Sequence, residues 1–413
     1  MIEQFELKNG IRVVFEESKF FNSASIGVWV GTGSRDEVKE NNGIAHMIEH
    51  MLFKGTKTRT AKDIAITTAI LGGNLNAYTS KECTSYYCKT LPQYLLEVVE
   101  LIGDMITNPL LSPEDLEKEK SVVCEEIDMY DDSCEDYVHE VLQKKIWKND
   151  SLGFLISGKK KVVKSFTVDS IREYMNEFYV GKNIVISIAG KFDRDVTKTA
   201  LENAFGSIKK SSVSCKNGLP KRNTPKYQRV KFATQRDIEQ LHLNMAFEIP
   251  SFVDKLRYEF TIINAILGGD VNSRLFQEIR EQRGLTYNIC TYGSAFFDTG
   301  LFHIYAALNA SQKDEVISLI RGIITDLCEN GVTSEEVANA KKQVIVEMTL
   351  NRDNTVSLMN SNAKAVMFYN EIISFKDTIK AIDRVSVESI NECIRKYFDL
   401  DKMSVALAGK ISE

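Results

Sequence analysis

The sequence predicts an α+β fold made of two homologous halves, each an antiparallel β-sheet with helices packed on one face. Two observations support this fold class. Short segments recur at corresponding places in the two parts of the chain, and each part places β-rich segments before long helix-forming ones. Strands followed by runs of helices, rather than strict alternation, are typical of α+β proteins.

The repeats are visible without an alignment. An Ala-Ile-Leu-Gly-Gly segment ends at Gly73 and again at Gly269, and the helix-forming segment that begins at Ser112 corresponds to one that begins at Ser334. Two further pairs share a single offset, 168–171 with 387–390 and 189–191 with 408–410. Self-similarity of this kind indicates an internal duplication.

Local patterns assign elements to the first half. β-formers and helical periodicity distinguish its strands from its helices. The expected strands are 11–15, 25–30 and 184–188, and the expected helices are 94–106, 113–129 and 170–179. Ser112 is a good N-cap for the second of these helices, because Pro113 follows at the first helical position.

A polar segment at 207–232 separates the halves. It is basic, contains no acidic residue, and carries Gly218, Pro220 and Pro225, which is typical of a linker. We therefore expect an N-terminal half at 1–208, a linker at 209–230 and a C-terminal half at 231–413. The lysines and arginines of the segment 207–232 are also compatible with a binding patch, although a solvated linker is the simpler interpretation.

Composition excludes several classes of protein. The chain has 413 residues and a net charge of −5, which argues against a nucleic-acid or anionic-membrane partner. No apolar run approaches the length of about 18 residues that a transmembrane helix needs. The N-terminus lacks the pattern of a signal or transit peptide, and the eight cysteines form no CxxC pair. We therefore expect a cytoplasmic protein with reduced cysteines.

The segment GIAHMIEHMLFKGT, residues 43–56, carries the main chemical signal. On a helix, His46 and His50 project about 40° apart, and Glu49 shares their face. Two imidazoles at this spacing can bind one metal ion, and a carboxylate beside them can hold a water molecule. We expect Asn41 or Asn42 to cap this helix and Gly55 to end it. The alternative is a surface helix with two solvent-facing histidines.

A catalytic zinc ion usually has a third protein ligand. His139, His242 and His303 stand alone in apolar or mixed stretches, so the best candidates are Glu119 and Glu126, two helical turns apart on one face. Glu125 points away and is expected to be solvated. In the second half, Lys341 stands in place of Glu119 and Met348 in place of Glu126. The histidine pair has no counterpart there either.

These residues resemble the inverted zinc-motif peptidases, the family of pitrilysin, insulin-degrading enzyme and mitochondrial processing peptidase. The length and duplication are similar to a short bacterial branch close to the processing peptidase β subunit. The resemblance implies that His46, His50 and Glu126 bind one Zn²⁺ per chain. It also implies that Glu49 is the general base toward a zinc-bound water, and that Glu119 is a supporting carboxylate.

Two other stretches are similar to parts of this family. Asn76-Ala-Tyr-Thr79 resembles the edge strand that pairs with substrate, so Asn76 and Ala77 are expected to contact the peptide. Arg280 and Tyr287 resemble the arginine and tyrosine that bind substrate and the tetrahedral intermediate. The loop before them departs from the family pattern at Asp270 and Asn272.

The resemblance implies a zinc-dependent endopeptidase that hydrolyses peptides or unfolded segments. One alternative is a non-catalytic scaffold or core-type subunit of the same fold. A metal-sensing regulator would need a basic DNA-binding element, and none is evident. Because this chain carries the zinc motif together with the arginine and tyrosine, we also expect a homodimer.

Overall fold

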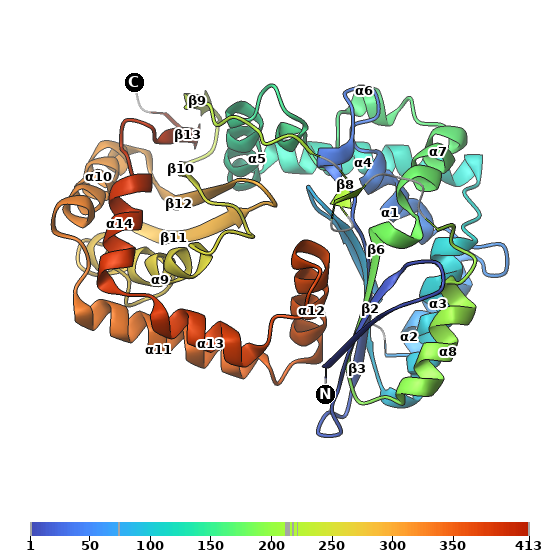
Figure 1. Cartoon of the computed structure of the whole chain (residues 1–413). Coiled ribbons are helices and arrows are strands. Elements are labelled where there is room, and N and C mark those ends of the chain that lie inside the picture. The colour runs from blue at the N-terminus through green and yellow to red at the C-terminus, as the bar shows by residue number, and fades with distance from the viewer. Residues whose placement is uncertain (1, 73–74, 211–214, 217–218, 221, 412–413) are drawn as a thin grey trace. The chain divides into compact units, whose positions relative to one another are not determined.

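The computed structural model describes residues 2–72, 75–210, 215–216, 219–220 and 222–411. Within these limits the chain forms two compact units (Figure 1). The first unit consists of Met1–Asp128, Phe154–Asn223 and Leu350–Ile373, and the second of Met129–Gly153, Thr224–Thr349 and Ser374–Glu413. Gly73, which ends the first repeated pentapeptide, lies outside the described residues.

The two sheets have the same strand order, which confirms the predicted α+β duplication. The first sheet runs β1-β2-β6-β3-β5-β4, and the second runs β9-β13-β10-β12-β11 in the same sense without a counterpart of β1. Neighbouring strands are antiparallel except for β2 with β6 and β13 with β9. The first sheet comprises β1 (Ile2–Glu6), β2 (Arg12–Glu17), β3 (Ala24–Val30), β4 (Asn76–Thr79), β5 (Thr84–Thr90) and β6 (Ile184–Gly190). The second comprises β9 (Lys231–Gln235), β10 (Gln240–Ile249), β11 (Thr286–Ala295), β12 (Gly300–Asn309) and β13 (Ser404–Gly409).

The helices also follow the repeat. Each AGK segment closes a strand, β6 or β13, and the helices before these strands begin with equivalent capping boxes at Thr167 and Ser386. The helices of the first half are α1 (Ile44–Leu52), α2 (Ala61–Ile70), α3 (Leu95–Thr107), α4 (Pro113–Asp132), α5 (Cys134–Ile146), α6 (Lys160–Val163), α7 (Val168–Phe178) and α8 (Arg194–Phe205). Those of the second half are α9 (Arg257–Leu267), α10 (Lys313–Asn330), α11 (Ser334–Asn351), α12 (Thr355–Tyr369), α13 (Phe375–Arg384) and α14 (Val387–Tyr397). The connecting segment contributes the two-residue strands β7 (Cys215–Lys216) and β8 (Leu219–Pro220).

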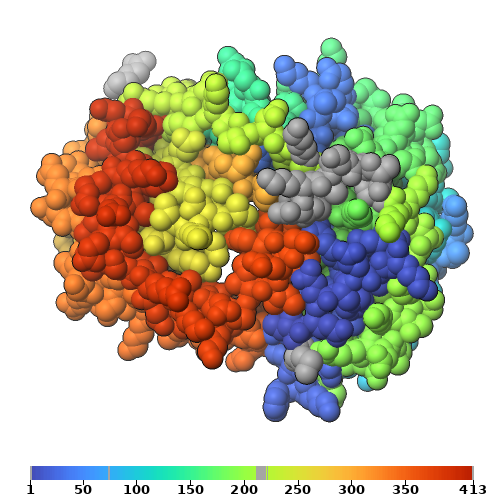
Figure 2. Space-filling model, viewed as in Figure 1, coloured from blue at the N-terminus to red at the C-terminus, as the bar shows by residue number. Residues whose placement is uncertain are grey.

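Each unit takes one helix from the other half of the sequence. In the first unit, α12 packs on β2, β3 and β6, on the side of the sheet opposite α1, α2, α3 and α8 (Figure 1). Figure 2 shows α12 in orange-red directly against the N-terminal segment in blue. Polar contacts hold α12 there: Ser25 Oγ lies 2.7 Å from Thr355 Oγ1, and Asn362 donates to Glu16 over 2.7 Å. The predicted halves, 1–208 and 231–413, describe the repeat along the chain rather than the compact units, and these ranges stay a prediction.

The second unit shows the equivalent arrangement with α5. Alternate residues of β10, such as Leu243 and Met245, enter the core beneath α9, α10 and α14. Ala246, on the opposite face, joins a cluster with Val138 and Leu142 of α5. Both helices are exchanged at the same point of the repeat, directly after α4 and α11.

Three histidines that stand apart in the sequence meet beneath α5. Asn244 contacts His139 Nδ1 at 2.7 Å and His303 Nδ1 at 3.1 Å, while His242 Nδ1 lies 2.7 Å from the Tyr305 hydroxyl. Burial lowers the pKa of His139 to about 4 and that of His303 to about 3. These rings are therefore neutral, and they serve as polar core residues of the second unit.

No helix in the described part of the chain is both long and apolar enough to cross a membrane. The cysteines with described surroundings are all free, and most of them are buried. The buried ones behave as small hydrophobic residues of the core.

Because α5 packs on the second sheet, removing one of its core contacts should lower the free energy of unfolding. Leu142 is fully buried against the second sheet, so Leu142→Ala should lower the free energy of unfolding by about 2–5 kcal/mol. Lys144, on the exposed side of the same helix, provides the control, and Lys144→Ala should change stability little. Urea unfolding of both variants measures the difference. Equal stabilities would contradict the role of α5 as a core element.

Candidate zinc site

Helix α1 carries the His46–Glu49–His50 motif, and its N-terminus is fixed by a residue outside the helix. The buried carboxylate of Glu37 accepts hydrogen bonds from the backbone N–H groups of Gly43 and Ala45, at 2.8 and 2.9 Å. Gly43 adopts φ = 100°, a conformation that favours glycine. The expected cap by Asn41 or Asn42 is wrong, because Asn42 donates to Glu37 instead and Asn41 accepts from Val38.

The apolar face of α1 determines the direction in which the two histidines project. Met47, Ile48 and Met51 are fully buried in the first unit's core, which fixes the rotation of the helix about its axis. His46 and His50 then project together, with ring centroids 4.6 Å apart. The helix ends at Leu52, shortly before Gly55 with φ = 121°.

Helix α4 brings the third candidate ligand, Glu126, to the two histidines. Ser112 caps it as predicted, since its hydroxyl accepts from Asp115 N at 3.0 Å. Glu126 Oε2 lies 3.7 Å from His46 Nε2 and 3.6 Å from His50 Nε2, and one ligand atom from each of the three residues lies within 4.8 Å of the others. Tetrahedral zinc bonds of about 2.0–2.2 Å separate ligand atoms by about 3.3–3.6 Å, so the three side chains fit a zinc ion.

Glu119 supports one of these ligands. Its Oε2 lies 3.0 Å from His50 Nδ1, and its Oε1 accepts from Lys54 Nζ at 2.7 Å. With Nδ1 directed to a carboxylate, His50 would hold a metal ion through Nε2, an arrangement common in zinc proteins. Lys54 was missed by sequence reasoning; it lies in the turn directly after α1, four residues beyond His50.

The electrostatics of the site match this donor set. Burial and, to a lesser extent, the neighbouring His50 lower the pKa of His46 to about 4. Burial also lowers the pKa of His50, but hydrogen bonds to Glu119 and Glu126 outweigh this effect and raise it to about 9. For Glu119, burial raises the pKa, but the partners His50 and Lys54 lower it more. A divalent cation held by His46, His50 and Glu126 would take the place of the His50 proton as the charge between the carboxylates.

Glu49 lies beside the ligands without belonging to them. Its Oε2 accepts a hydrogen bond of 2.5 Å from the hydroxyl of Thr79, the last residue of β4. Burial raises the pKa of Glu49, although the Thr79 hydrogen bond partly opposes this. Thr79 was missed as a partner because only the fold brings β4 next to α1.

The predicted peptide-binding residues lie on the edge of the first sheet. β4 is the terminal strand and pairs only with β5 among the described strands. Asn76 is exposed, Ala77 is partly buried, and Asn76 Oδ1 accepts from Ala77 N at 2.8 Å. Tyr78 packs inward, where its hydroxyl accepts from Trp29 Nε1 at 3.2 Å.

Arg280 and Tyr287 belong to the second unit, where the structure brings them together. The Arg280 guanidinium lies 5.0 Å from the centre of the Tyr287 ring, within the range of a cation–π contact. The pairing of β11 with β12 shifts between Thr286 and Asn288, so Tyr287 is the extra residue of a bulge. Its side chain is 81 % exposed, while Arg280 is half-buried.

Comparison with known proteins agrees with this geometry. A family model described as insulinase (peptidase family M16) matches residues 12–159, and one described as peptidase M16 inactive domain matches residues 165–344. The uncharacterized zinc protease YmxG of Bacillus subtilis is 36 % identical over 401 residues, covering 97 % of both chains. An uncharacterized zinc protease of Streptomyces coelicolor is 32 % identical and covers 95 % of this chain and 86 % of the relative.

Solved structures share the fold at lower identity. A protease from Helicobacter pylori superposes with a TM-score of 0.90 at 20 % identity, covering 99 % of both chains. A chain of complex III from Candida albicans superposes with a TM-score of 0.84 at 18 % identity, covering 99 % of this chain and 96 % of that one. At these identities the likeness shows the fold alone.

The contact between Glu119 and His50 predicts a loss of metal affinity in Glu119→Gln. The variant weakens the orientation of His50, and we expect zinc to bind about 10–100-fold more weakly. Competition with a fluorescent chelator measures the affinity. Glu125→Gln, an exposed neighbour on the same helix, is the matched control and should bind zinc as the parent chain does. Equal affinities for the two variants would exclude a supporting role of Glu119.

Proposed function

The chain belongs to the insulinase family of peptidases, peptidase family M16, and on this premise we propose that it is a zinc-dependent endopeptidase that hydrolyses peptides or unfolded segments. The observation that carries the proposal is the convergence of His46, His50 and Glu126, with the Glu49 carboxylate beside them. Zinc in such a site supplies a Lewis acid that activates water and polarises a carbonyl.

Glu49 is the residue that moves protons in this proposal. It takes a proton from the attacking water and then gives it to the amine that leaves when the peptide bond breaks. The hydrogen bond from Thr79 holds one carboxylate oxygen and leaves the other for water. Burial favours the protonated form of Glu49, which helps it to act as an acid in the second step.

The edge strand β4 is the proposed binding site for the peptide backbone. An extended peptide can add to the free edge of the sheet by main-chain hydrogen bonds, whatever its sequence. Asn76 and Ala77 would contact the peptide there. We assign Arg280 and Tyr287, on the resemblance and on their mutual contact, to binding substrate and its developing oxyanion.

The second candidate function is a non-catalytic scaffold. The fold similarity to a chain of complex III is the observation that keeps this alternative open. The complete set of three ligands and a base argues for catalysis, because a scaffold needs none of them. Measured zinc content and peptide hydrolysis of the purified chain distinguish the two functions.

The proposed base predicts a clean separation of binding from catalysis. Glu49→Gln removes the proton acceptor without removing a ligand, so we expect bound zinc to remain and kcat to fall on the order of 10²–10⁴-fold. Cleavage of a mixed peptide library with parallel metal analysis measures both. Removing zinc with a chelator and restoring it is the control for metal dependence. Hydrolysis at the parent rate by Glu49→Gln would refute the assignment of the base.

The expected homodimer is a separate proposal. It follows from the presence of the zinc ligands and of the Arg280–Tyr287 pair in the same chain, which leaves no need for an unlike subunit. Multi-angle light scattering of the zinc-loaded chain should give twice the chain mass of 46.7 kDa. A fully active monomer would contradict this expectation.

A further inference from the structure

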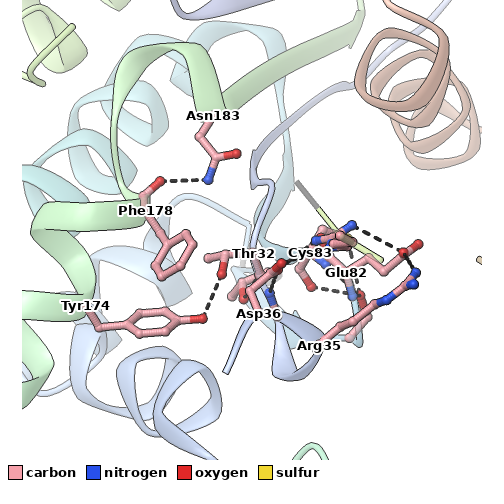
Figure 3. A network of polar contacts seen from close by, with 12 residues as sticks. Thr32, Arg35, Asp36, Glu82, Cys83, Tyr174, Phe178 and Asn183 are labelled. Carbon is pink, nitrogen blue, oxygen red and sulfur yellow. Dashed lines mark hydrogen bonds and ion pairs between the residues drawn. The ribbon is translucent and has the colours of Figure 1, made fainter. Parts of the chain in front are cut away.

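A cluster of four buried charges lies at the end of β3 and β4 in the first unit. It consists of Arg35, Asp36, Glu82 and Arg222, whose side chains are between 1 and 6 % exposed. Arg35 Nη1 contacts Glu82 Oε1 at 2.6 Å, and Figure 3 shows Arg35, Asp36 and Glu82 side by side. Two cations balance two anions, so each charge depends on the others for compensation. We call these four residues the Arg222 cluster.

Arg222 enters this cluster from the segment that connects the two halves. Its guanidinium forms a bidentate pair with Asp36, with Nε–Oδ1 at 2.8 Å and Nη2–Oδ2 at 2.6 Å. The Arg222 guanidinium also donates to the backbone carbonyl of Glu82 at 3.1 Å. The backbone carbonyl of Asn223, the residue after Arg222, accepts from Arg35. The sequence predicted a solvated linker here, but at Arg222 the segment is anchored.

The cluster fastens two loops to each other. One follows β3 and contains Gly33 to Glu37, and the other is the β4–β5 turn at Ser80–Cys83. Their backbones are directly bonded, from Arg35 N to Lys81 O at 2.8 Å and from Ser34 N to Ser80 O at 3.2 Å. A Cβ atom on Gly33 would lie 2.1 Å from Ser80 O, so no larger residue fits between the loops.

Each loop contains or directly follows a residue that bonds to α1, the helix of the zinc motif. Ser80 directly follows Thr79, whose hydroxyl holds the carboxylate of Glu49. Asp36 directly precedes Glu37, whose carboxylate caps the N-terminus of α1. A shift of either loop therefore changes the position of β4 or of α1, while the ligand atoms themselves lie outside the cluster.

We propose that Arg222 is a positioning residue of the peptidase: by pairing with Asp36 and Glu82 it fixes the β4–β5 turn, and through Thr79 it fixes the orientation of Glu49 and of the edge strand. This inference rests on the proposed function. It assigns to the connecting segment a role in setting the geometry of the catalytic base. The polar contacts of Arg222 go to Asp36 and Glu82, which are neither candidate metal ligands nor residues of β4.

The test compares Arg222→Met and Arg222→Lys with the exposed Arg229→Met as the matched control. All are measured as the full-length, zinc-loaded chain. We expect Arg222→Met to reduce kcat/KM roughly 10- to 100-fold through displacement of the base, with zinc affinity unchanged. Arg222→Lys, which keeps the charge but loses the bidentate pair, should recover part of the loss, and Arg229→Met should match the parent.

A double variant identifies the route of the effect. Thr79→Val removes the hydrogen bond to Glu49, so adding Arg222→Met should lower kcat only slightly further. If the loss of kcat in the double variant equals the product of the losses in the two single variants, Arg222 acts by another route and the proposal is overturned. A parent-like kcat/KM in Arg222→Met would also overturn it.

Hydrogen exchange separates this inference from the proposed function. In Arg222→Met, amides of residues 76–84 should exchange faster, while those of α3 stay protected. If the parent chain cleaves no peptide, the proposed function fails, and faster exchange at 76–84 still supports the anchoring role. Unchanged exchange at 76–84, or a loss of protection across the whole first unit that Arg222→Lys does not reverse, would refute it.

Discussion

The site depends on one constraint: two imidazoles one turn apart on α1 must face two carboxylates two turns apart on α4. A buried carboxylate such as Glu119 is not stable alone, because an unpaired buried charge costs several kcal/mol, on the order of 3–5 when its partner is removed. Glu119 is matched by His50 and Lys54, and Glu126 by the histidine rings. Helices α1 and α4 are held in register by their apolar faces, where Met51 and Val123 are fully buried. Packing therefore sets the distance at which the polar groups meet.

The second half of the chain shows that this fold does not need the site. In α11, the counterpart of α4, Met348 replaces Glu126 and packs against the apolar core of the second unit. Lys341 replaces Glu119 and donates to the backbone carbonyl of Asp383 at 2.8 Å. The same strand order forms without counterparts of the histidine pair and of the two glutamates. The fold therefore does not require the two buried groups, His46 and Glu119, or the two partly buried ones, His50 and Glu126. This supports the proposal that they serve chemistry.

The sequence predicts those features that depend on local geometry. The spacing of His46 and His50, the two-turn separation of Glu119 and Glu126, and the Ser112 cap all follow from 3.6 residues per turn, and the structure agrees with each. The cap by Glu37, the partner Thr79 and the anchor Arg222 could not be predicted, because each joins segments whose proximity is set by the path of the chain. The exchange of α5 and α12 has the same origin: amphipathic periodicity reveals an apolar face but not the sheet that covers it.

The duplicated sheet order also gives the two predicted substrate-binding regions a common structural basis. β4 and β11 are the terminal strands at the same end of their respective sheets. In the first unit this edge carries Asn76 and Ala77 and ends at Thr79, which links it to Glu49. In the second unit the bulge at Tyr287 turns an aromatic side chain outward at the start of the strand, over the guanidinium of Arg280. An edge strand leaves backbone groups available, so both sheets present an edge suited to extended peptides. Under the proposed function, the first edge lies beside the groups that break the peptide bond, and the second carries side chains suited to holding an anion or a carbonyl oxygen.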